Sequence, residues 1–186
     1  MKLHRHYSMR LQQWDYSWTG VYFITICTKG RQKILGDIRD TICYPSSYGN
    51  VAYQTWFNLQ NYYDCYLDEF IIMPDHIHGI IFVKQLDKMS VRDIGTVGNV
   101  GAIHELPLRS DGKQNVAYQK IRRNMIIPKM IGRFKMQSGK MINEIRDTPG
   151  QMVWQRDYYE SVIRSQRELH HVRQYIINNP QNWQRN

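Results

Sequence analysis

The chain has 186 residues, of which 42% are hydrophobic and 22% charged, a composition typical of one soluble domain with a sizeable core. No apolar run approaches the roughly 18 residues that span a bilayer, and the first residues lack the apolar segment of a secretory signal. We therefore expect a cytoplasmic protein without membrane association. The three cysteines, Cys27, Cys43 and Cys65, form no C-x-x-C pair, which argues against a disulfide framework and against a zinc knuckle.

The first half of the chain contains three predicted strands and one predicted helix. β-branched and aromatic residues predict a strand over 21–28, and apolar residues at near-helical spacing predict a helix over 51–63. Two more strands, 66–73 and 76–84, flank a Pro-Asp turn signal. Together they predict a β-hairpin.

Residues 85–115 are polar and rich in glycine, without a sustained period, and predict a long loop or insertion. A helix is expected to follow, because Pro128 suits a first helical turn and apolar residues recur as far as Ile145. Ser138-Gly139 interrupts this pattern, so we expect a kink or two shorter helices there.

The last predicted helix has clear start and stop signals. Ser165 and Glu168 fit a capping box, and apolar residues follow at helical spacing. Pro180 disfavours helical geometry at Asn179, so the helix is expected to end there.

Two histidines stand on one predicted strand. Side chains alternate across a strand, so His76 and His78 share one face and Ile77 points to the other. Two adjacent imidazoles can bind a divalent cation, although a closed site needs at least one more ligand. The alternative is that both are ordinary surface or hydrogen-bonded histidines, as we expect for His4 and His6, which have the same spacing.

The last predicted helix supplies two further candidates. Tyr175 and Asn179 are four residues apart, so they fall on one side of a helix that reaches that far. A phenol one turn from a carboxamide, near two imidazoles, would place a nucleophile beside a metal site. Without that neighbourhood, Tyr175 is equally well a core aromatic and Asn179 a helix cap.

The net charge of +9 predicts a polyanionic partner. The segment 109–146 is strongly basic and contains only two acids, Asp111 and Glu144. The aromatic content of 12% favours single-stranded nucleic acid, because bases stack on aromatic rings. Our phosphate-contact candidates are Lys129, Arg133, Lys135 and Lys140, with a solvated helix face as the alternative for each.

Four segments in the same order resemble the REP-associated tyrosine transposases, single-domain relatives of the single-tyrosine HUH transposases. They are YFITICT (22–28), DEFIIMPDHIHGIIF (68–82), VWQRDYYESVIR (153–164) and HHVRQYIINNPQNW (170–183). The resemblance implies one α+β domain over 1–186, with an antiparallel sheet flanked by helices in a ferredoxin-like or RRM-like arrangement. It also implies a homodimer.

The resemblance implies roles for individual residues. His76 and His78 match the metal-binding pair, Tyr175 the nucleophile, and Asn179 a polar third ligand. Tyr158 and Tyr159 are rival nucleophiles. We expect Trp154 to be structural or to stack on a base, and Arg156 to contact DNA. His104 and Glu105, in the long loop, have no counterpart in the family pattern.

The implied activity is metal-dependent nicking and strand transfer on single-stranded DNA at hairpins, through a covalent 5′-phosphotyrosine intermediate. The cofactor would be Mg²⁺ or Mn²⁺, and imidazole and carboxamide ligands suit Mn²⁺ somewhat better. A DNA substrate would place the protein at the nucleoid. Two alternatives stay open: a nucleic-acid-binding module of the same shape without nuclease activity, and a metal-dependent phosphohydrolase that uses an activated water.

Overall fold

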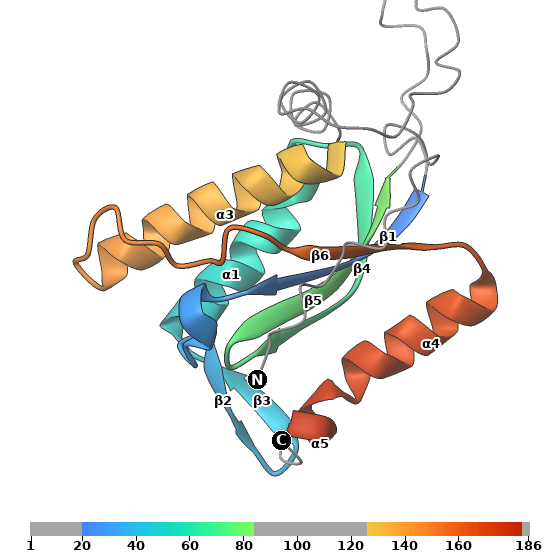
Figure 1. The fold of residues 1–186 in the computed structure, drawn as a ribbon, viewed down its shortest axis with the longest axis horizontal. Coiled ribbons are helices and arrows are strands. Elements are labelled where there is room, and N and C mark those ends of the chain that lie inside the picture. Colours follow the sequence, from blue (N-terminus) through green and yellow to red (C-terminus); the bar gives the residue numbers. More distant parts are fainter. Residues whose placement is uncertain (1–19, 84–125, 184–186) are drawn as a thin grey trace, which may run out of the picture.

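The structure is a computed structural model that describes residues 20–83 and 126–183. Its main sheet is antiparallel, with strand order β4-β5-β1-β6. The strands are β1 (Gly20–Cys27), β4 (Cys65–Met73), β5 (His76–Val83) and β6 (Tyr159–Ile163). Helices cover both faces of this sheet (Figure 1). The α+β architecture inferred from the sequence is thereby confirmed, as are the strand at 21–28 and the hairpin around Pro74-Asp75.

One face of the sheet packs against two helices, α1 (Ser47–Phe57) and α3 (Ile126–Ile145). The fully buried core between them includes Tyr22 and Ile24 of β1, Trp56 of α1 and Phe134 of α3. Burial of such large side chains stabilises the fold by roughly 1.5–3 kcal/mol each. This layer holds most of the hydrophobic core.

The boundaries of α1 and α3 differ from the predicted ones. Ser46 caps α1 by accepting a hydrogen bond from the Gly49 amide, so the helix begins before residue 51, and a short 3-10 turn, η2 (Asn58–Asn61), follows it. The kink expected at Ser138-Gly139 is absent, and α3 is continuous. The hydroxyl of the buried Ser138 donates to the Phe134 carbonyl at 2.6 Å, so this polar side chain has a hydrogen-bond partner inside the helix.

The other face of the sheet packs against α4 (Gln166–Ile177) and the short α5 (Asn179–Trp183). A smaller core joins Ile80 and Ile163 of the sheet to Leu169 and Ile176 of α4. The predicted cap is confirmed, because the Ser165 hydroxyl accepts from the Glu168 amide at 3.1 Å. The helix ends at Ile177, two residues before the predicted end.

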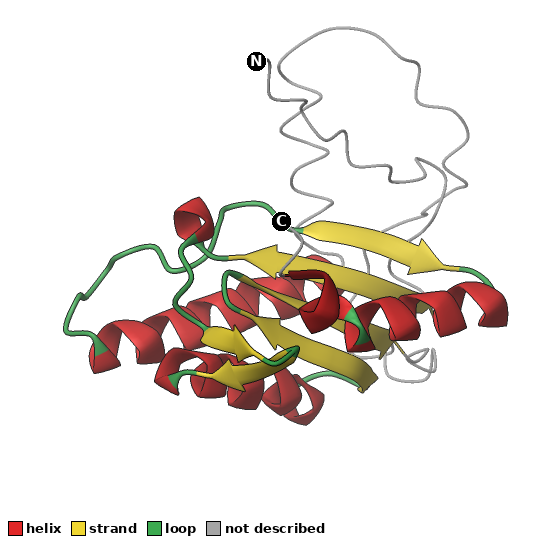
Figure 2. Cartoon of the chain, turned by 90° about the horizontal axis from the view of Figure 1, so that it is seen from below, coloured by secondary structure: helices red, strands yellow, loops and turns green. Residues whose placement is uncertain are grey.

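The sequence did not predict three short strands. One is β6, and the other two form a separate hairpin, β2 (Gly36–Arg39) with β3 (Ile42–Pro45). This hairpin lies beside α5 (Figure 2). The predicted loop at 85–115, with His104 and Glu105, lies outside the described residues, as do His4 and His6. No helix in the described part of the chain is long and apolar enough to cross a membrane.

Candidate functional site

The pairing of β1 with β5 determines where the two histidines lie. Thr25 stands opposite His78, and Cys27 stands opposite His76. Because side chains alternate along a strand, Ile77 enters the main core while both imidazoles face the α4 layer. They contact that layer through ring contacts with Tyr175 and Trp183.

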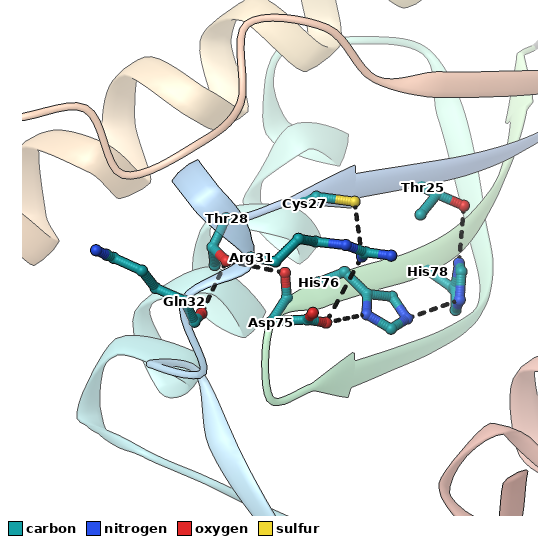
Figure 3. A network of polar contacts seen from close by, with 8 residues as sticks. All are labelled: Thr25, Cys27, Thr28, Arg31, Gln32, Asp75, His76 and His78. Carbon is teal, nitrogen blue, oxygen red and sulfur yellow. Dashed lines mark hydrogen bonds and ion pairs between the residues drawn. The ribbon is translucent and has the colours of Figure 1, made fainter. Parts of the chain in front are cut away.

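The two imidazoles converge on one point. Their Nε2 atoms lie 3.0 Å apart. Each Nδ1 atom has its own partner: Thr25 Oγ1 at 2.8 Å from His78, and Asp75 Oδ1 at 2.5 Å from His76 (Figure 3). Engagement of both Nδ1 atoms orients both Nε2 atoms for an external ligand, as in metal sites whose histidines are held by a second group. The pair can therefore supply two ligands to a divalent cation, and the described residues contain no group of three or more His, Cys, Asp and Glu side chains that could hold one.

Burial keeps this pair in the form that a metal requires. Desolvation, together with the nearby charges of His76 and Arg31, lowers the pKa of His78 to about 3. Desolvation also lowers the pKa of His76, and its hydrogen bond with Asp75 opposes that shift. Neutral imidazole is the ligating form, so the pair is ready for a cation at neutral pH.

Asp75 is a site residue that sequence reasoning missed. It was interpreted only as part of a turn, yet it is 6% exposed and its carboxylate lies between His76 and Arg31. The Arg31 guanidinium is 3.6 Å from the carboxylate oxygen that holds His76. An acidic residue directly before the first histidine of the pair is a sequence signal that could have identified it, because metal-ligating histidines commonly donate their second ring N–H to a carboxylate.

Asp75→Asn should weaken Mn²⁺ binding about 10- to 100-fold, because a neutral amide oxygen is a weaker acceptor for the His76 Nδ1–H. Electron paramagnetic resonance detects free Mn²⁺ during a titration and so measures the affinity of each variant directly. Asp37→Asn, at an exposed carboxylate of β2, is the matched control and should leave the affinity unchanged. Equal affinities in both variants would show that Asp75 does not orient the histidine.

Tyr175 of α4 lies beside the pair. Its ring centroid is 5.3 Å from that of His78 and 6.0 Å from that of Phe23, and the side chain is 48% exposed. Tyr159 of β6 lies on the same face, 6.1 Å from Phe23, so it stays a rival nucleophile. Tyr158 packs against the main core on the opposite face, which removes it as a rival.

Asn179 is buried and begins α5, so it does not continue the helix that carries Tyr175. It lies in the chain between Tyr175 and Trp183, whose rings both contact the histidine pair. Within the described segments, no hydrogen bond joins Asn179 to either imidazole. Its role as a third ligand therefore stays a prediction.

The predicted phosphate contacts of α3 lie in the layer on the opposite side of the sheet from the histidines. Lys129, Lys140 and Arg156 are exposed, and the Arg133 guanidinium lies 4.0 Å from the centre of the Tyr62 ring. These residues are available to a polyanion but do not adjoin the histidine pair. Whether they contact DNA stays a prediction.

Two of the predicted DNA contacts are engaged within the protein. Trp154 is 5% exposed and its Nε1 donates to the Ser138 hydroxyl at 2.8 Å, which agrees with the structural role of its two predicted alternatives and leaves the ring closed to a base. The Lys135 ammonium donates to three backbone carbonyls, those of Gln155, Arg156 and Asp157, at 2.8, 3.2 and 3.0 Å. Its three N–H donors are thereby occupied within the protein.

We expect Lys135→Met to lower the free energy of unfolding by about 2 kcal/mol, because three carbonyls lose a charged donor. Lys140→Met, at an exposed position on the same helix, should change it by no more than about 0.5 kcal/mol. Urea denaturation of the two variants provides the comparison. Equal midpoints would show that the ammonium does not stabilise the segment that follows Trp154.

No family model matches the sequence. An uncharacterised protein of Haemophilus influenzae is 31% identical over 186 residues, covering 98% of this chain and 92% of the relative.

Among solved structures, a REP-associated tyrosine transposase bound to a REP hairpin matches 98% of this chain and 74% of its own, with a TM-score of 0.54 and 14% identity. A candidate transposase from Deinococcus radiodurans matches 96% of this chain and 97% of its own, with a TM-score of 0.45 and 15% identity. The first match shows a shared fold, which agrees with the fold that the sequence resemblance implied.

Proposed function

We propose that this chain, which belongs to one family with the Haemophilus influenzae protein and has the fold of a REP-associated tyrosine transposase, nicks and rejoins single-stranded DNA through a covalent tyrosine intermediate. One observation carries the proposal: a half-exposed phenol lies beside two imidazoles whose Nε2 atoms converge. A nucleophile and a cation site on one face would supply the attacking group and the polarisation of the phosphate that metal-assisted cleavage by a tyrosine uses.

His76 and His78 would hold a divalent cation through Nε2, with Asn179 as the proposed third ligand. The cation, Mn²⁺ or Mg²⁺, would polarise a non-bridging phosphate oxygen. Thr25 and Asp75 fix the two rings from behind, so the imidazoles need not reorganise when the site is loaded.

Tyr175 would supply the nucleophile. Its phenolic oxygen forms a bond to phosphorus and its proton passes to solvent, to which the half-exposed side chain has access. The bond from phosphorus to the 3′-oxygen breaks, and that oxygen keeps the electron pair and takes up a proton. The products are a 5′-phosphotyrosine and a free 3′-hydroxyl, and the reverse reaction reseals a strand because the bond energy is conserved.

The proposed substrate is single-stranded DNA next to a hairpin. A duplex would enclose the scissile strand, whereas a folded-back strand offers both shape and an exposed flank. The similar transposase was solved with a REP hairpin, which supports this choice. The exposed cations of the α3 layer would contact phosphates away from the cleavage point, and we propose that the chain acts as a homodimer.

Incubation with hairpin-bearing oligonucleotides and Mn²⁺, followed by denaturing gels, tests the proposal. The DNA is taken from palindromes that flank the gene. A covalent protein–DNA band that disappears with EDTA is the expected result. Metal-dependent cleavage without an adduct would favour the phosphohydrolase. Tight binding with neither cleavage nor adduct, across several hairpins, would favour the binding module.

A further inference from the structure

Arg31 lies in a fixed turn that is tied to the histidine strand. It belongs to the short 3-10 turn η1 (Lys29–Arg31), directly after β1. Thr28, which is fully buried, holds this turn: its hydroxyl hydrogen-bonds the carbonyls of Gln32 at 2.8 Å and Asp75 at 3.0 Å. The Thr28 amide also donates to the Asp75 carbonyl, at 2.9 Å. The same contacts that fix Asp75 therefore fix the base of the Arg31 side chain.

The Arg31 guanidinium is directed towards the histidine pair (Figure 3). Its Nη1 donates to Cys27 Sγ at 3.0 Å and lies 3.6 Å from Asp75 Oδ1. The side chain is 55% exposed, and in the described ranges Nε and Nη2 make no hydrogen bond. One edge of the guanidinium is thus held by the protein, and two donors remain for an external acceptor.

Arg31 has a φ of 57°, in the left-handed region that a residue with a Cβ rarely adopts. The ion pair of its half-exposed side chain with Asp75, at 3.6 Å, gives little stabilisation in return. The backbone is therefore held in an unfavourable conformation where the guanidinium adjoins the cation site, as is common at functional positions.

We propose that Arg31 binds the phosphodiester at the histidine site, donating from Nε and Nη2 to its non-bridging oxygens. A planar guanidinium with two parallel donors matches two phosphate oxygens, and its positive charge would offset the negative charge that grows during attack at phosphorus. The inference rests on the proposed function and adds to it a phosphate-binding residue that is no metal ligand.

Binding of thymidylyl-thymidine, which contains one phosphodiester, tests the role without requiring cleavage. Electron paramagnetic resonance first gives the Mn²⁺ affinity of each variant, and ³¹P relaxation by protein-bound Mn²⁺ then gives the affinity for the dinucleotide. Arg31→Gln should weaken dinucleotide binding about 10- to 100-fold and leave Mn²⁺ affinity unchanged. Arg31→Lys keeps the charge without the two parallel donors. Its dinucleotide affinity should lie between that of Arg31→Gln and that of wild type.

Two controls isolate the phosphate contact. Arg39→Gln, at an exposed arginine of β2 that pairs with Asp37, should behave as wild type. The uncharged methylphosphonate dinucleotide should bind wild type and Arg31→Gln equally. Unchanged dinucleotide affinity in Arg31→Gln would overturn the inference. A fall in Mn²⁺ affinity as large as the fall in dinucleotide affinity would also overturn it, because Arg31 would then act only through Asp75. Absence of Mn²⁺ binding in wild type would overturn the metal-dependent function itself, and is seen before any dinucleotide is added.

Discussion

Tyr175→Phe is expected to abolish the covalent protein–DNA adduct, with a loss of at least about 10³-fold in single-turnover adduct formation. The substitution removes the phenolic oxygen and keeps the ring that contacts His78 and Phe23. Because the side chain is half-exposed, the free energy of unfolding should change by less than about 0.5 kcal/mol. Denaturing gels with hairpin DNA and Mn²⁺ measure the adduct, and urea denaturation checks the fold.

Tyr159→Phe is the matched control, because Tyr159 is also half-exposed and also contacts Phe23. The two tyrosines differ in one relevant respect: the Tyr175 ring packs directly against His78. Tyr159→Phe should therefore form the adduct at a rate close to that of wild type. Loss of the adduct in Tyr159→Phe and not in Tyr175→Phe would reverse the assignment, and loss in neither would exclude both as the nucleophile.

Local sequence signals predicted the elements that carry the site. The Pro74-Asp75 turn signal between two predicted strands gave the hairpin of β4 and β5, and the capping box gave the start of α4. Both signals are local, because a turn or a cap depends on residues close together in the chain. The shared face of His76 and His78 follows from the alternation of side chains along a strand.

The long-range partners of the site could not be predicted in that way. Asp75 adjoins His76 in the chain, but Thr25 reaches the Nδ1 atom of His78 only because β1 pairs with β5 in one particular register. Arg31 lies beside Asp75 because the turn after β1 is tied to the Asp75 carbonyl. The Thr25–His78 and Thr28–Asp75 contacts join residues 53 and 47 positions apart, and strand propensity carries no information on register.

Sequence reasoning also failed to distinguish exposed cations from occupied ones. Lys135 and Lys140 both lie in the basic segment of the sequence and cannot be told apart there. In the structure the Lys135 ammonium donates to three backbone carbonyls, whereas the Lys140 side chain is exposed. The difference arises because the segment after α3 folds back along one side of the helix. Charge composition predicts a polyanionic partner, and only the tertiary structure separates lysines that bind within the protein from those with an exposed ammonium group.

Mn²⁺ should stabilise the folded chain, and His78→Ala should remove that effect. A ligand that binds only the folded state adds RT ln(1 + [L]/Kd) to the free energy of unfolding. At a ligand concentration of one hundred times Kd the gain is about 2.7 kcal/mol. For a chain of this length the gain corresponds to roughly 5–10 °C in Tm. In the proposed site both Nε2 atoms, which are 3.0 Å apart, bind the cation. Loss of the His78 imidazole leaves too few ligands to hold it.

Thermal unfolding with and without Mn²⁺ measures this effect in the absence of DNA, so it tests the metal site separately from the nuclease. His171→Ala is the control, because His171 is an exposed histidine of α4 and should keep the full shift in Tm. For each variant the Tm without Mn²⁺ is subtracted from the Tm with Mn²⁺, since His78→Ala also removes a buried ring and lowers the Tm by itself.

An equal Mn²⁺ shift in the Tm of His78→Ala and of wild type would place the cation elsewhere. Tyr175 would then lie beside two hydrogen-bonded histidines with no metal to activate a phosphate, and the case for a binding module would outweigh that for a nuclease.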